Sequence, residues 1–246
     1  MQSEMVIKDS VIKRVNEEEL VCSFFGDRVG FFLDVGANHP VDGSQSYALE
    51  KLGWSGICVE PQPKYVQLHE RLRKSKIVSC ACGSPSQAGQ ELILHTLDSN
   101  ASLVPRRVLY TNSNQFEASY SVRVETIDKI LDLNNVEKLD FLSIDIEGFE
   151  IEAFSGFSLN RYRPTLILIE DHLYDHKVHR LLKKSGYKLI RRTELNMWYV
   201  PSEFPVKLTS SAKFQLLRKL YLAHIPRLWR RFYKSKIKNR LAKILS

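Results

Sequence analysis

Short apolar runs alternate with longer amphipathic runs along residues 10–200 of the chain. Runs of about four to eight apolar residues are typical of strands buried on both faces, and a period of about 3.6 residues is typical of helices. The alternation therefore predicts an α/β fold built on a doubly wound, mostly parallel sheet of about seven strands. The expected core strands are residues 30–35, 56–60, 77–80, 139–144, 164–170, 187–191 and 196–200, of which the last two form an antiparallel pair.

Amphipathic segments between these strands predict the helices. Asp9 or Ser10 is expected to cap the first helix, and Ser44 the second. The pattern is less regular in the middle of the chain, where a polar segment, residues 98–117, lies between two half-exposed strands. Long loops in compact domains are often functional, so this segment is expected to be a lid or to face the substrate. The expected helices are residues 10–25, 44–52, 63–74, 126–131, 177–185 and one that begins near Phe149, and the expected half-exposed strands are 91–96 and 120–124.

The net charge of +8 is concentrated in the carboxyl-terminal region. Residues 206–246 hold twelve of the 36 Lys and Arg residues and no acidic residue, whereas the other 205 residues hold 24 basic and 28 acidic side chains. The pattern predicts one domain, residues 10–203, followed by a basic amphipathic helical arm, residues 206–246. In its second half, apolar residues recur every three to four positions, at Trp229, Phe232, Tyr233, Ile237, Leu241 and Ile244.

This arm favours binding to an anionic membrane surface, with the apolar face in the interface and Lys and Arg toward the headgroups. Packing on the domain or on another subunit is one alternative, and nucleic acid is a less favoured one, because no RNA-binding module accompanies the arm. No stretch of about 18 apolar residues suggests a membrane span, and the amino terminus lacks the apolar core of a secretory signal. We therefore expect a cytoplasmic protein that the arm can hold at the inner face of the membrane.

The remaining composition is that of a globular domain, with 43% hydrophobic and 26% charged residues. Disorder and a small disulfide scaffold are excluded at this length. The four cysteines lack the paired spacing of a zinc site, and we expect reduced thiols, with Cys58 and Cys80 buried in strands.

Polar residues follow the first two predicted strands where ligands bind in parallel sheets. The first strand ends in the sequence LDVGAN, in which Gly36 permits a tight turn and Asp34 and Asn38 offer hydrogen bonds. The second strand ends at Glu60, and a carboxylate there can accept both hydroxyls of a ribose. The loop after the first strand lacks the GxGxxG pattern that binds pyrophosphate, and the chain has no GxxxxGK[ST] phosphate-binding loop. A phosphate-free adenosyl cofactor, S-adenosylmethionine, therefore fits better than a dinucleotide.

A second acidic group follows the buried strand 139–144. Asp145 and Glu147 alternate with Ile residues there, and we expect them to face the cleft, because burying an unpaired carboxylate costs several kcal/mol. Glu150 is expected to be a helix-start residue that the helix dipole favours.

Four stretches, DVGANHPVDGS, GWSGICVEPQP, VETIDKIL and DFLSIDIEGFEIEAFSGF, resemble motifs of the FkbM family of S-adenosylmethionine-dependent methyltransferases, in the same order and at similar spacing over residues 30–172. The resemblance implies a class I, Rossmann-like methyltransferase and transfer to a hydroxyl oxygen, often of a sugar in a glycan, a lipopolysaccharide precursor or a glycosylated natural product. His39-Pro40 departs from the commoner Ile-Gly of the family. The residues that the resemblance implies for cofactor binding are Asp34, Gly36, Ala37, Asn38, Ser44, Glu60, Cys82 and Asp145.

Two routes can remove the proton of a hydroxyl acceptor. In the first, a general base among Asp145, Glu147 and His172 takes the proton. In the second, Asp145, Glu170 and Asp171 hold a divalent ion such as magnesium, which lowers the pKa of the alcohol. His176 and His179 are expected to be structural or solvated. Rival hypotheses are a non-catalytic binding protein that retains the fold and a methyltransferase acting on RNA, although the Asn-Pro-Pro-aromatic motif of amine-directed enzymes is missing after strand 139–144.

Overall fold

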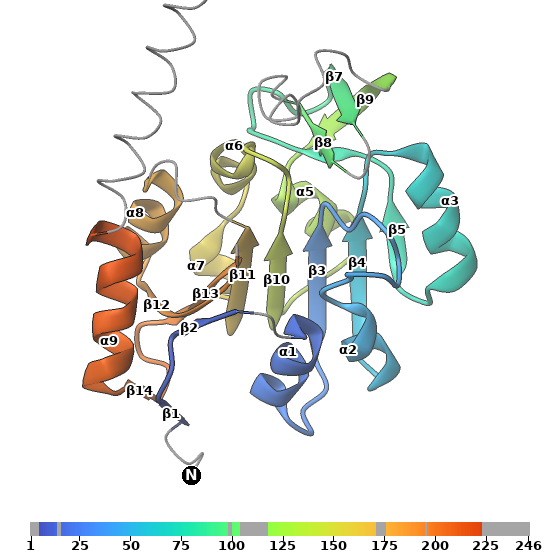
Figure 1. Ribbon diagram of the computed structural model, residues 1–246. Helices are drawn as coiled ribbons and strands as arrows, with labels where there is room; N and C mark the ends of the chain where they lie inside the picture. The colour runs from blue at the N-terminus through green and yellow to red at the C-terminus, as the bar shows by residue number, and fades with distance from the viewer. Residues whose placement is uncertain are drawn as a thin grey trace, which may run out of the picture.

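An eight-stranded mixed sheet forms the centre of the computed structural model, which describes residues 5–13, 16–97, 100–103, 118–170, 176–194 and 196–222 (Figure 1). All seven expected core strands are present, and one further strand, the two-residue β2, lies at one edge of the sheet. The order across the sheet is β2 (Val11–Ile12), β12 (Tyr187–Thr193), β13 (Asn196–Pro201), β11 (Leu166–Glu170), β10 (Phe141–Ile144), β3 (Phe31–Val35), β4 (Ser55–Val59) and β5 (Lys76–Val78). β13 is antiparallel to both of its neighbours, and the other pairs are parallel, so the α/β class and the mostly parallel sheet are confirmed.

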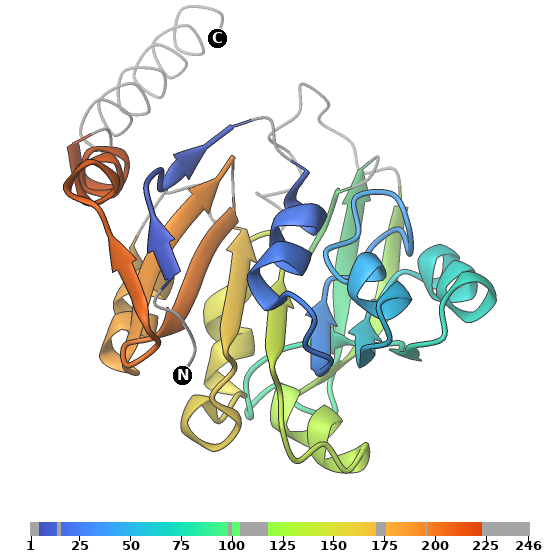
Figure 2. The same cartoon turned by 90° about the horizontal axis from the view of Figure 1, so that it is seen from below.

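At the edge of the sheet, Val11 and Ile12 of β2 pair in parallel with Arg192 and Thr193 of β12. Because successive side chains on a strand point to opposite faces, the central strands contribute side chains to two separate hydrophobic cores, one on each face of the sheet. Phe32 and Phe141 face one side, where α1 (Glu17–Phe25) and α2 (Tyr47–Lys51) pack. Leu33 and Leu142 face the other side. That side is covered by α5 (Ile127–Leu133), α6 (Glu150–Ser155), α7 (Leu159–Tyr162) and α8 (Lys177–Lys184), as the end-on view in Figure 2 shows.

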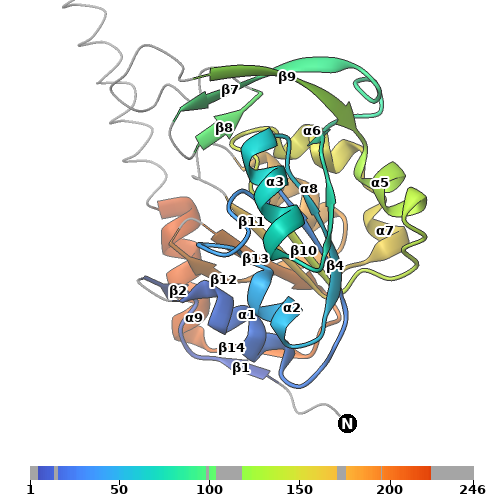
Figure 3. The ribbon, with the colours of Figure 1, turned by 90° about the vertical axis from the view of Figure 1, so that its right-hand side faces the viewer.

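A smaller sheet lies over the carboxyl ends of the central strands (Figure 3). Its strand order is β6 (Ala81–Cys82), β9 (Ala118–Glu125), β7 (Glu91–Leu97) and β8 (Asn100–Ser102). Leu94, Val122 and Val124 form its core. The two half-exposed strands are therefore confirmed as β7 and β9. Residues 98–99 and 104–117 of the expected lid segment lie outside the described residues.

The first helix begins later than the sequence predicts. α1 starts at Glu17 with Asn16 as its cap, whose side chain accepts the backbone N–H of Glu19. The expectation of a helix from residue 10 with a cap at Asp9 or Ser10 was wrong, because the β-branched pair Val11–Ile12 joins the sheet instead. Ser10 is buried, and its hydroxyl donates to the carbonyl of Ile190.

The second helix is shorter than predicted. α2 begins at Tyr47, with Ser46 in the cap position. Ser44 lies in the preceding turn, where its Oγ accepts the backbone N–H groups of Ser46 and Tyr47. The prediction that Ser44 caps a helix from residue 44 was therefore wrong in position, although the hydroxyl does satisfy N–H groups at the helix start.

The first and the last described strands pair with each other at one edge of the domain. β1 (Met5–Ile7) pairs in parallel with β14 (Val206–Leu208), and α9 (Ser210–Leu217) continues into the π-helical turn η1 (Arg218–Leu222). Ala212 and Leu220 of this segment are buried against the domain. The rest of the predicted arm, residues 223–246, lies outside the described residues. Within the described ranges, no helix has the length and apolarity to cross a bilayer.

Candidate active site

A pocket opens at the carboxyl edge of the main sheet, where β3, β4, β10 and β11 end. β3 has β4 on one side and β10 on the other, so the direction of strand order changes beside it. Such a point is where parallel α/β sheets bind ligands. The pocket is walled by the ends of these strands, by the segment around β6, and by β7 and β8 of the small sheet above.

Gly36 allows the chain to turn at the end of β3. Its φ is +78°, and a Cβ at this position would lie 1.9 Å from the carbonyl oxygen of Asp145. Only glycine fits there without moving the backbone. The N–H groups of Gly36 and Ala37 both donate to the carbonyl of Val59, which ties the turn to the end of β4.

Glu60 is a buried carboxylate in the pocket wall, with 2% of its surface exposed. One of its oxygens accepts the N–H of Asn38 at 2.9 Å, and the other accepts the N–H of Gln62 at 2.8 Å. Burial raises the pKa of Glu60 to about 7, although these N–H groups act in the opposite direction. Each carboxylate oxygen has two lone pairs, so both can accept a further hydrogen bond from a ligand in the pocket.

Three carboxylates converge on the opposite wall. Oxygens of Asp145, Glu147 and Glu170 lie within 4.8 Å of one another. Asp145 exposes its surface to this pocket, and desolvation together with the charges of Glu170 and Glu147 raises its pKa well above the usual value. Clustered carboxylates disfavour full ionisation, so the group attracts protons or cations.

The small sheet forms the roof of the pocket. Leu94, Ala101 and Leu103 contribute apolar surface to the wall. The hydroxyl of Ser102 donates to the carbonyl of Glu147 at 2.8 Å, and Glu147 has a positive φ of 50°. This bond joins β8 of the roof to the loop that carries the acidic residues.

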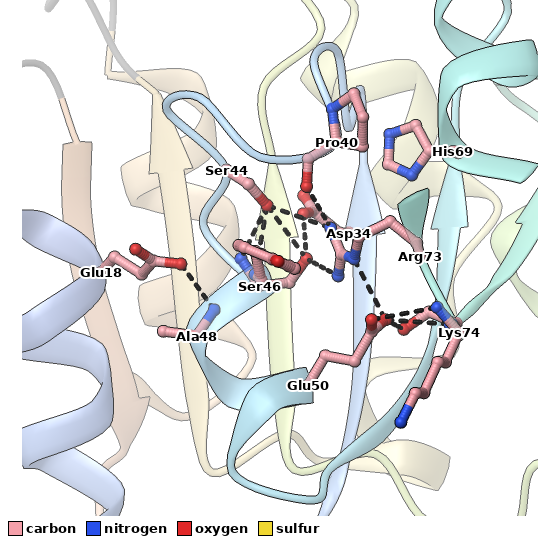
Figure 4. A network of polar contacts seen from close by, with 12 residues as sticks. Glu18, Asp34, Pro40, Ser44, Ser46, Ala48, Glu50, His69, Arg73 and Lys74 are labelled. Atoms are coloured by element: carbon pink, nitrogen blue, oxygen red, sulfur yellow. Dashed lines mark hydrogen bonds and ion pairs between the residues drawn. The ribbon is translucent and has the colours of Figure 1, made fainter. Parts of the chain in front are cut away.

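Asp34 and Ser44 belong to a buried network behind the pocket rather than to its wall (Figure 4). The Ser46 hydroxyl donates to Asp34 at 2.6 Å, and Arg73 donates to Ser46, to Ser44 and to the carbonyl of Pro40. Burial raises the pKa of Asp34, while the Ser46 hydrogen bond and the Arg73 charge lower it. The network holds the loop between β3 and α2 in place.

The structure divides the residues that the sequence singled out into three groups. Ala37 is buried with Asp34 and Ser44 away from the pocket wall, so any contact of these three with a cofactor remains a prediction. Asp171 and His172 lie outside the described residues. The residues brought together around the pocket are Gly36, Asn38, Glu60, Cys82, Asp145, Glu147 and Glu170.

The other expectations about single residues can be compared with their surroundings. His179 is buried and bonds the hydroxyls of Tyr199 at 3.0 Å and Tyr221 at 3.3 Å, which agrees with a structural role. Glu150 is the first residue of α6 and accepts the N–H of Gly148. The four cysteines are free, and Cys58 and Cys80 are buried as expected.

Three residues of the site were missed in the sequence. Gln62 lines the pocket two residues after Glu60, a spacing that could have indicated it. Ser102 lies in a polar segment without a motif, and Arg73 acts on a loop about 30 residues away in the chain. No local pattern indicates either contact.

A carboxylate-lined pocket lies at the strand-order reversal of a mostly parallel sheet, with a buried acid at the end of the second central strand. The fold and the site therefore define an α/β domain with a ligand-binding site at the carboxyl ends of its strands. The family model described as the methyltransferase FkbM domain matches residues 34–189, which is more than half of the chain. The chain therefore belongs to the FkbM methyltransferase family.

Among solved structures, the chain is similar to the methyltransferase FkbM from Methylobacillus flagellatus KT, a crystal structure at 2.20 Å resolution. The two share 15% sequence identity with a TM-score of 0.46, over 70% of this chain and 44% of that chain. This chain thus matches less than half of the length of that protein. No curated protein matches the sequence.

Proposed function

We propose that the chain transfers a methyl group from S-adenosylmethionine to a hydroxyl oxygen. The observation that carries the cofactor assignment is the charge of the pocket. Four carboxylates line it, those of Glu60, Asp145, Glu147 and Glu170, and none of its described lining residues is basic. Such a site favours a ligand with a sulfonium and an ammonium group and disfavours the pyrophosphate of a dinucleotide.

The residues around the pocket suit the parts of this cofactor. Glu60 can accept hydrogen bonds from the two ribose hydroxyls, since each of its oxygens has a lone pair left. The apolar side chains of Leu94 and Leu103 and the small Cys82 suit the adenine side, and Asp145 and Glu147 suit the cationic end. When bound, the cofactor supplies an activated methyl group on sulfur.

The acidic residues would take the proton of the acceptor. An alcohol does not ionise at pH 7, so a base must accept its proton as the oxygen attacks. Asp145 has a pKa raised by desolvation and by neighbouring carboxylates, which makes its ionised form a stronger base than an ordinary aspartate. Glu147 lies in the same cluster and is the second candidate, and His172 is a third one from the sequence.

We assign the acceptor to the sugar class, as a glycan, a lipopolysaccharide precursor or a glycosylated natural product. Family membership supports this class, and carboxylate oxygens are good acceptors for the several hydroxyls of a sugar. Transfer to RNA is the alternative acceptor. Incubating the protein and methyl-labelled cofactor with fractionated cell extract, followed by mass spectrometry, distinguishes them: label in RNA and none in saccharide would refute our assignment.

A divalent ion is a second route to the same reaction. The converging oxygens of Asp145, Glu147 and Glu170 are hard ligands of the kind that magnesium binds, and Asp171 is a further candidate from the sequence. An ion there would lower the pKa of the alcohol and orient it. If this route operates, thorough chelation abolishes transfer and magnesium restores it, while Glu170→Gln raises the magnesium concentration needed. Activity that survives chelation excludes the ion and leaves the carboxylate base.

The cofactor assignment is tested by titration calorimetry with S-adenosylmethionine and its demethylated product. The two ligands differ by the charge on sulfur, so Asp145→Asn and Glu147→Gln should weaken binding of the methylated cofactor several-fold more than binding of the product. Glu152→Gln in α6, at a residue that does not line the pocket, is the matched control and should change neither. Equal losses for both ligands would contradict the charge argument, and no heat with either would contradict the assignment.

A further inference from the structure

The last described segment of the chain exposes an apolar stripe. Ten large hydrophobic side chains are exposed among the described residues, and four of them lie between residues 214 and 222. Phe214 is 58% exposed and Leu217 is 49% exposed. We name this set of residues the α9 stripe; its members are Phe214, Leu217, Tyr221 and Leu222.

The opposite face of the same segment packs against the domain, which leaves the stripe exposed. Ala212, Leu216 and Leu220 recur every four residues and are buried against the domain. Gln215 adds polar contacts, because its side-chain oxygen accepts the N–H groups of Ser10 and Val11. Residues three or four positions apart share a helix face, so Phe214 and Leu217 lie together on the side away from the domain. Tyr221 lies at the border of this face, because its hydroxyl bonds His179 of the domain.

Basic residues accompany the stripe. Lys213 and Arg218 are exposed beside it, and Lys219 follows. Residues 206–246 contain twelve basic and no acidic residues, while the rest of the chain carries more acidic than basic residues. The positive charge of the protein is therefore concentrated in the region whose described part also exposes clustered apolar side chains.

We propose that the α9 stripe docks on an anionic lipid surface, with its apolar side chains in the interface and Lys213 and Arg218 at the headgroups. Apolar residues flanked by Lys and Arg are what such an interface binds. A symmetric contact between the stripes of two copies would place basic residues against the same basic residues, with no acid within residues 206–222 to offset them. Covering by residues 223–246 meets the same objection, since that segment is also basic.

The stripe lies on a flank of the domain beside the sheet. The hydroxyl of Tyr221 bonds His179 in α8, which follows β11. Figure 1 shows α9 alongside the sheet, with its carboxyl-terminal end toward the level at which β10 and β11 end. A lipid surface along the stripe would therefore lie along this flank of the domain.

The test uses the full-length protein with sedimented vesicles of phosphatidylcholine alone or with about one-third phosphatidylglycerol. We expect binding to the anionic vesicles that weakens with added salt, and at least about tenfold weaker partitioning for the double variant Phe214→Ser with Leu217→Ser. The matched control is Val29→Ser with Leu133→Ser, which removes from elsewhere on the domain two apolar side chains that are even more exposed, and should bind like the wild type. Circular dichroism confirms that both variants are folded.

A second measurement reports contact directly. Tryptophan at position 217, as Leu217→Trp, should be quenched by brominated lipid, whereas tryptophan at position 133, as Leu133→Trp, should not exceed the wild-type background. Three results would overturn the proposal: equal partitioning of the stripe variant and wild type, equal binding to neutral and anionic vesicles, or no quenching at position 217. A dimer in ultracentrifugation that the stripe variant converts to monomer would assign the stripe to a second copy instead.

Discussion

Arg73 offers the sharpest test of how the loop between β3 and α2 is held in place. Its guanidinium is fully buried and donates to Glu50 at 3.0 Å, to the carbonyl of Pro40 at 2.9 Å and to Ser46 at 3.1 Å. Ser46 in turn donates to Asp34, so the arginine charge reaches a buried carboxylate through one hydroxyl (Figure 4). Arg73→Met removes all of these donors and leaves the acceptors in place.

The expected cost follows from these contacts. Removing one partner of a buried ion pair costs about 3–5 kcal/mol, and an unsatisfied buried acceptor costs about 1–3 kcal/mol. Glu50 keeps the N–H groups of Lys74 and Ser75, which reduces the loss on that side. We therefore expect a loss of about 4 kcal/mol in the free energy of unfolding, or a fall of about 10 °C in Tm for a domain of this size.

The assay is thermal unfolding with and without S-adenosylmethionine, together with titration of the cofactor. Arg73→Lys should fold better than Arg73→Met and still bind the cofactor about tenfold more weakly than wild type, because a single ammonium cannot reach all the acceptors. Arg71→Met, on the exposed side of the helix that Arg73 directly follows, α3 (Pro63–Leu72), should change Tm by less than about 2 °C. Adding Asp34→Asn to Arg73→Met should restore part of the loss. A Tm for Arg73→Met within about 2 °C of wild type would refute the reasoning.

Three further predictions concern single contacts. Ser102→Ala should lower kcat several-fold and leave cofactor affinity nearly unchanged, since it frees the Glu147 loop from the roof; an unchanged kcat would contradict this role. Asn16→Ala should lower the free energy of unfolding by about 1 kcal/mol in denaturant titrations, as for other lost caps, with Asp27→Ala beyond the helix as the neutral control. The pKa of Glu60 is about 7 in the folded protein and 4.5 in the unfolded chain. Protonated Glu60 therefore contributes about 3 kcal/mol to the free energy of unfolding below pH 4.5, and this contribution is lost as the pH rises through 7. Glu60→Gln should flatten that part of the pH dependence, and the wild-type affinity for the cofactor should rise between pH 6 and pH 8; an identical pH profile for the two proteins would contradict the assignment.

The strands were predictable because their burial is recorded in local sequence. Phe31–Val35, Phe141–Ile144 and Leu166–Glu170 are apolar on both faces, and each became a central strand within a few residues of its expected bounds. The start of α1 was not predictable in the same way. Residues 10–25 fit a helical period, but pairing of Val11 and Ile12 with β12, about 180 residues away, decides their conformation. Long-range pairing of this kind leaves no local signal.

The residues of the candidate site were also predictable only in part. Gly36, Glu60 and Asp145 were recognised because each directly follows a strand, and the ends of parallel strands meet at one edge. Asp34 was grouped with them, yet it lies one residue before the end of β3, and its side chain points to the face of the sheet that carries α1 and α2. Strand alternation thus places Asp34 on the opposite face of the sheet from Val35, which lines the pocket, so a motif that spans a strand end includes side chains on both sides of the sheet. The residues behind the sheet, Asp34 with Ser44 and Ser46, fix the loop through Arg73, so substitutions there should act on the cofactor through loop position rather than through direct contact.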